Sequence, residues 1–165
     1  MLAATVLAAT ALSACSPTFD WRDYRSNDAP YTVLFPAKPV QQTRTIDLDG
    51  QQVSMTMAAA VVDGTSFAVG SAEVADPAHA QIAVLAMKTA MVKNIGGTVT
   101  LDKVSGGQQT TIAIEARGSQ NGKPMLLAGH FVAKDKRIYQ VIVMARGKQV
   151  SQDTVDTFIS SFKLN

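Results

Sequence analysis

Tight-turn dipeptides recur between short apolar segments, and they constrain the fold more than any other feature of the chain. Asp49-Gly50, Asp63-Gly64 and Asn121-Gly122 each separate two such segments. Asp-Gly and Asn-Gly pairs favour two-residue hairpin turns, which need positive φ angles. Tight turns of this kind join neighbouring strands in antiparallel order. The sequence therefore predicts a sheet built mainly from antiparallel hairpins.

The segments between the turns alternate as half-buried strands do. In 52–57, for example, Val53, Met55 and Met57 fall on one face, and polar side chains fall on the other. Strands are predicted over 31–35, 43–48, 52–57, 66–74, 98–104, 110–118, 123–133 and 137–145.

Two helices interrupt and close the series. Asp76 suits the N-cap of the first helix, Pro77 its first position, and Gly96 its end. Two apolar stripes on this helix favour burial on more than one side: Ile82, Leu85, Thr89 and Val92 on one, and Val84, Met87, Met91 and Ile95 on the other. Ser151 caps the second helix, whose single stripe is Val155, Phe158, Ile159 and Phe162.

A half-buried sheet needs its apolar face covered, and the two helices are available to cover it. The sequence therefore predicts a single α+β domain over 31–165, in which an antiparallel β-sheet is covered by two helices. This arrangement is an α/β sandwich.

The N-terminal segment carries a targeting pattern. Residues 1–14 are uncharged and apolar, and Leu12-Ser13-Ala14-Cys15 ends them with the form of a bacterial lipobox. Fourteen helical residues span roughly 21 Å, which is short of the ~30 Å hydrocarbon core. We therefore expect a lipoprotein signal peptide over 1–14 and a lipid on Cys15, the only cysteine. An ordinary secretory signal with an incidental cysteine is the alternative.

Residues 15–30 are interpreted as the lipidated Cys15 and a polar tether. Trp21 and Tyr24 lie in this tether, and docking on the domain is favoured over insertion at the lipid interface. Ser16 follows the cysteine, and by resemblance to known lipoproteins it favours the outer membrane, facing the periplasm, in a Gram-negative cell. The predicted location is the cell envelope.

Charge and composition limit the partners. The chain has 15 Lys and Arg against 13 Asp and Glu, a formal net charge of +2. So small a charge argues against nucleic acid as the main partner. The basic residues near the C-terminus fall at two opposite ends of the last strand, which indicates two solvated turns: Lys134, Lys136, Arg137, Arg146 and Lys148.

The sequence contains no recognisable catalytic or cofactor motif. Gly64-Thr65-Ser66 runs from a turn into a strand, which is the wrong context for a nucleophile elbow. His79 and His130 have no second ligand at metal-binding spacing. Thioethers can bind soft copper, but Met55 with Met57 and Met87 with Met91 are interpreted as core. We expect no catalytic residue, no metal site and no cofactor.

Three segments carry a family resemblance: Tyr31-Thr32-Val33-Leu34-Phe35-Pro36, Arg137-Ile138-Tyr139-Gln140-Val141, and Phe158-Ile159-Ser160-Ser161-Phe162. With them, the chain resembles bacterial envelope lipoproteins that have a PsbP/Mog1-like domain. The resemblance covers 31–164 and implies that fold. It carries over no functional residue, because members of this group differ in function.

These observations favour a monomeric, membrane-anchored envelope lipoprotein that is not an enzyme and binds a protein partner or a small ligand. Two alternatives stay open. One is an envelope hydrolase whose active site is dispersed, and the other is a structural protein of the envelope.

The lipid anchor gives the first testable prediction. Cys15→Ala removes the atom that would carry the lipid, so the variant should lose lipid labelling and leave the membrane fraction. Labelling with an acyl analogue and sedimentation of membranes measure both effects. A variant that sediments with membranes as the wild type does would contradict the lipobox.

Overall fold

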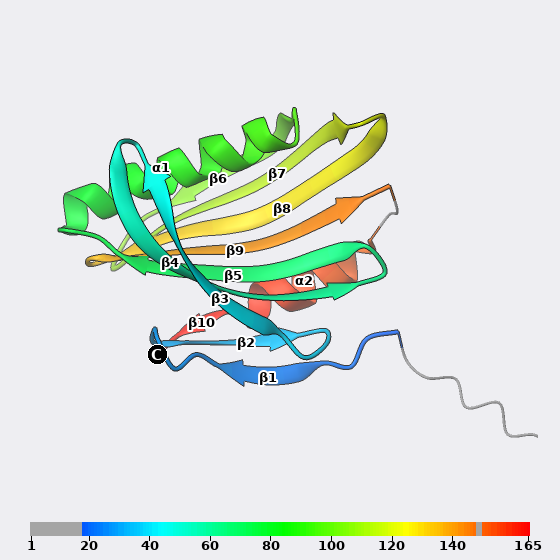
Figure 1. The fold of residues 1–165 in the computed structure, drawn as a ribbon, viewed down its shortest axis with the longest axis horizontal. Helices are drawn as coiled ribbons and strands as arrows, with labels where there is room; N and C mark the ends of the chain where they lie inside the picture. Colours follow the sequence, from blue (N-terminus) through cyan, green and yellow to red (C-terminus); the bar gives the residue numbers. More distant parts are fainter. Residues whose placement is uncertain (1–17, 148–149) are drawn as a thin grey trace, which may run out of the picture.

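The computed structural model describes residues 18–147 and 150–165. The predicted signal peptide, Cys15 and Ser16 lie outside this range. Ten strands and two helices make up the fold (Figure 1). They are β1 (Arg22–Arg25), β2 (Tyr31–Phe35), β3 (Val40–Leu48), β4 (Gln51–Val62), β5 (Thr65–Glu73), α1 (Pro77–Asn94), β6 (Thr98–Ser105), β7 (Thr110–Gln120), β8 (Lys123–Lys134), β9 (Arg137–Arg146), α2 (Gln152–Ser161) and β10 (Lys163–Leu164).

Seven strands form one long antiparallel sheet in the order β3-β4-β5-β9-β8-β7-β6. The predicted hairpin turns are confirmed. Asp49 and Gly50 have φ angles of 55° and 83°, and Asn121 and Gly122 have φ angles of 51° and 72°. Two successive positive φ angles are the geometry that matches the twist of a hairpin. The turns therefore set the order of the strands on both sides of the sheet.

Helix α1 lies along one face of the long sheet (Figure 1). Asp76 caps it as predicted, because its carboxylate accepts the backbone N–H of His79 at 2.9 Å. That hydrogen bond holds the pKa of Asp76 below its ordinary value. One stripe of the helix is buried, including Val84 and Met87. The expected burial of the other stripe is wrong, because Ile82 and Leu85 are about half exposed.

The opposite face is covered by α2 together with a second sheet, in the order β1-β2-β10 (Figure 1). Part of the segment interpreted as a tether is strand β1, which pairs with β2. The predicted docking of Trp21 and Tyr24 is confirmed. The Trp21 ring lies 6.5 Å from that of Phe67, and the Tyr24 ring lies 5.4 Å from that of Phe35.

The predicted fold class is wrong. An α+β sandwich of one sheet covered by two helices requires a single sheet, whereas the described part of the chain is mainly β, with 56% of its residues in strands that form two antiparallel sheets. The second sheet escaped prediction because β1 is short and polar, and β10 has only two residues. Both strands pair with β2, which therefore stands apart from the long sheet.

The closing helix yields a stability prediction. The Phe158 side chain is fully buried, with ring centroids 5.4 Å from those of Phe35 and Phe67. Phe158→Ala should therefore lower the free energy of unfolding by about 3–5 kcal/mol, because it leaves a cavity. The control is Val104→Ala at an exposed site, which should stay within about 0.5 kcal/mol. Equal unfolding midpoints for wild type and Phe158→Ala in denaturant would contradict the burial of α2.

Candidate functional site

Methionine side chains gather beside α1. Six of the seven methionines line two hollows on the face of the long sheet that α1 covers: Met55, Met57, Met87, Met91, Met125 and Met144. The prediction that the four paired methionines fill the core is confirmed for Met55 and Met87, which are buried. Met57 and Met91 are only partly buried. We call the two hollows together the methionine groove.

The first hollow lies between α1 and the strands β3 and β4, and has a volume of about 380 Å³. Its walls are mostly apolar, with four thioethers among them. Its polar side chains are Arg44, Asp47, Asn94 and Gln140. A hollow that is largely apolar and carries a few polar groups is the usual form of a small-molecule site.

Gln140 is a buried polar side chain on this apolar face. It is 7% exposed and lies in the centre of β9, where Gln140 is opposite Gly70, which in turn is opposite Met57. The Gln140 Nε2 atom donates to Met57 Sδ at 3.2 Å. The lack of a side chain at Gly70 makes this contact possible, since a Cβ atom there would lie 2.5 Å from Sδ. A thioether is a weak acceptor, so the carboxamide keeps most of its hydrogen-bonding capacity.

The second hollow has a volume of about 500 Å³ and adjoins the first, because Met91 and Asn94 line both. Met125 on β8 and Met144 on β9 line it as well. Arg146 also lies here, and its guanidinium donates to Gln120 Oε1. The groove therefore follows the flank of α1 and continues around its C-terminal end.

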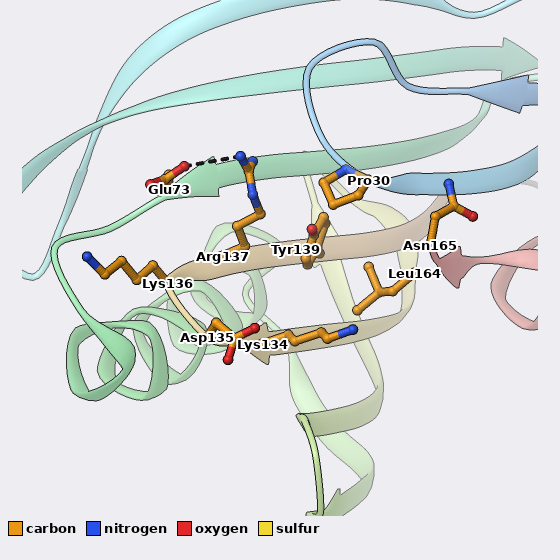
Figure 2. A pocket seen from close by; sticks show the side chains of 9 residues that line it. All are labelled: Pro30, Glu73, Lys134, Asp135, Lys136, Arg137, Tyr139, Leu164 and Asn165. Carbon is orange, nitrogen blue, oxygen red and sulfur yellow. Dashed lines mark ion pairs between the residues drawn. The ribbon is translucent and has the colours of Figure 1, made fainter.

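A third hollow, of about 520 Å³, lies at the other end of β9 (Figure 2). Arg137 pairs with Glu73 at 3.1 Å, and the side chains of Lys134 and Lys136 extend in opposite directions (Figure 2). Burial raises the pKa of Tyr139, which lines the hollow and stays a neutral phenol. The positive charges are thus paired or dispersed, and they do not converge on one ligand.

The two basic groups lie at opposite ends of β9 as predicted. Lys134, Lys136 and Arg137 are at one end and Arg146 at the other. Lys148 lies outside the described residues. The described basic residues therefore lie at two separate turns, as predicted, and do not form one basic patch.

Neither histidine lines the methionine groove. His79 is in the first turn of α1, as predicted, and its Nδ1 atom lies 2.7 Å from Asp76 Oδ2. His130 lies on β8 with its side chain on the α2 side, and the neighbouring Phe131 is buried on the α1 side. The described residues bring no three His, Cys, Asp or Glu side chains together as metal ligands.

Sequence reasoning missed Gln140 and Arg44. The signal for Gln140 is its position, as the one polar residue in the buried run 138–143 of β9 other than Tyr139. No such signal marks Arg44, because strand β3 is mostly polar and exposed.

No family model matches the chain, and no curated protein matches it. Within the described part of the chain, neither helix combines the length and the apolar character needed to cross a bilayer.

The environment of His130 gives a pH prediction. Burial lowers the pKa of His130 below its ordinary value of 6.5. The unfolded chain therefore takes up more protons than the folded chain as the pH falls through about 6.5, and stability falls with it. Melting temperatures between about pH 7.5 and pH 5.5 should decline less steeply for His130→Gln than for the wild type. Equal slopes would show that burial of His130 contributes nothing.

Proposed function

We propose that this chain is a lipid-anchored protein of the cell envelope, not an enzyme, that binds a small apolar ligand in the methionine groove. The observation that carries the proposal is the convergence of six methionines and the buried Gln140 on two adjoining hollows. The anchor rests on Cys15 and the leader before it.

Methionine suits a site that must accept an apolar molecule. Its side chain is unbranched, flexible and polarisable, so it adapts to the shape of a ligand. Volumes of about 380 and 500 Å³ lie within the range of roughly 300–1,000 Å³ that is typical of small-molecule sites. The partly exposed Met57 and Met91 would become covered when a ligand binds.

The large exposed apolar side chains are scattered over the surface, and this favours a small ligand over a protein partner. The large ones are Val40, Val61, Ile82, Leu85 and Val104, which lie on four different elements. An interaction surface for a protein needs a contiguous apolar patch. The groove, in contrast, concentrates its apolar side chains in one place.

A variant that fills the groove tests the proposal. Ala90 is exposed on α1 and lines the first hollow. Ala90→Trp should place an indole in that hollow and weaken the binding of Nile red, an uncharged fluorescent probe, by roughly tenfold or more. The matched control is Thr89→Trp, because Thr89 is exposed on the same helix and lines neither hollow.

Fluorescence titration of the folded variants measures the effect. Failure of the wild type to bind Nile red, or equal binding by the two tryptophan variants, would contradict the proposal. A Met57→Leu, Met91→Leu double variant separates apolar binding from thioether coordination, because leucine keeps the volume and removes the sulfur. Tight binding of Cu(I) that this variant loses, without any binding of Nile red, would replace an apolar ligand with a soft metal ion.

A further inference from the structure

The charges at the groove point to the class of ligand, and this inference rests on the proposed function. We infer that the methionine groove binds a single-chain amphiphile with one carboxylate, such as a long-chain fatty acid. Its head lies at Arg44, and its chain runs along Met57 and Met91 toward Met125 and Met144.

Arg44 is a cation whose donors are free in the described structure. It lies on β3 opposite Met55, on the rim of the first hollow. None of the hydrogen bonds or ion pairs among the described residues involves its side chain. A guanidinium group can donate two parallel hydrogen bonds to the two oxygens of a carboxylate. An anionic head at this rim would therefore gain a partner without displacing one.

Asp47 is the acidic side chain that lines the same hollow, and both of its carboxylate oxygens already accept hydrogen bonds. Its Oδ1 atom accepts the backbone N–H of Gly50 at 2.9 Å, and its Oδ2 atom accepts Gln52 Nε2 at 2.9 Å. These bonds direct the carboxylate to the hairpin turn. Its negative charge nevertheless stays close to the rim, which favours a head with one negative charge over a head with two.

The second hollow gives the chain of the ligand its path. It meets the first hollow at Met91 and Asn94, and it is lined further on by Met125 and Met144. The cation at its far end, Arg146, already donates to Gln120. Among the described residues of the groove, Arg44 is therefore the cation left to bind an anion, and the head is placed at that end.

Gln140 lies at the base of the first hollow, beneath the part of the ligand chain that follows the head. Its carboxamide is buried, and the described structure gives it one hydrogen bond, to Met57 Sδ. A methylene chain lying above Met57 makes no demand on this bond, so the pair can stay intact when the ligand binds. Away from the Gln140 carboxamide, polar groups along the length of a ligand would have to be desolvated against four thioethers.

Competition against Nile red tests the inference. Hexadecanoate, below its critical micelle concentration, should displace the probe from the wild type with roughly fivefold higher affinity than hexadecanol, the uncharged analogue of the same length. Arg44→Gln should remove this preference, so that hexadecanoate and hexadecanol displace the probe with equal affinity. Lys38→Gln is the matched control, since Lys38 is exposed and lines neither hollow, and it should keep the preference. High salt should weaken hexadecanoate more than hexadecanol.

The outcomes separate the two proposals. If the wild type binds Nile red but hexadecanoate and hexadecanol displace it equally, the carboxylate assignment is overturned and the apolar groove stands. The same conclusion follows if Lys38→Gln loses the preference as Arg44→Gln does, because the effect is then one of net charge. If the wild type binds no Nile red, the proposed function fails and this inference fails with it.

Discussion

On one face of the seven-stranded sheet there is a single helix, and that helix is much narrower than the sheet. The rest of the structure depends on this difference in width. Strands about 4.8 Å apart make a seven-stranded sheet about 29 Å wide, whereas a helix with its side chains is about 10 Å wide. Helix α1 packs mainly on β8 and β9 and contacts β7 and β3 only slightly. Part of the face beside the helix is therefore left for other side chains to fill, and the methionines fill it.

The two faces of the sheet are packed with different kinds of side chain. On the α2 side, the Phe158 ring lies against the rings of Phe35 and Phe67 in tilted and edge-on arrangements. Tyr24 from β1 lies against Phe35, and Trp21 from the chain before β1 lies against Phe67. Aromatic rings have few rotatable bonds and fixed preferred geometries, so this core is rigid. On the α1 side the flexible thioethers dominate the edge of the core. The second core therefore leaves the two hollows of the methionine groove beside α1.

Local chemistry made much of the fold predictable. The hairpins at Asp49-Gly50 and Asn121-Gly122, the cap at Asp76 and the apolar stripe of α2 are each set by residues close together in the sequence. The second sheet was not predictable in this way. Strands β1 and β10 are polar and short, and they are strands only because β2 lies between them. That pairing joins the two ends of the described chain, and a local pattern does not encode it.

The candidate site was predictable only in part. The paired spacing of Met55 with Met57 and of Met87 with Met91 singled out four residues that line the groove, but the sequence favoured core packing as the reason for the spacing. Whether these methionines only fill the core or also line a groove depends on where β4 and α1 lie relative to each other. That placement is set by the order of strands in the sheet, which pairs residues far apart in the sequence. The role of Gly70 in making room for the Gln140 side chain is evident only once β5 and β9 are known to be neighbouring strands.

The central claim is that the methionine groove is the place where this protein binds its ligand. NMR spectra of isotope-labelled methionine methyl groups test it most directly, because six of the seven methionines line the groove and each gives its own signal. On titration with hexadecanoate, we expect the signals of Met57 and Met91 to shift most and those of Met125 and Met144 to follow. Saturable binding that leaves all of these signals unchanged would place the ligand elsewhere and contradict the account.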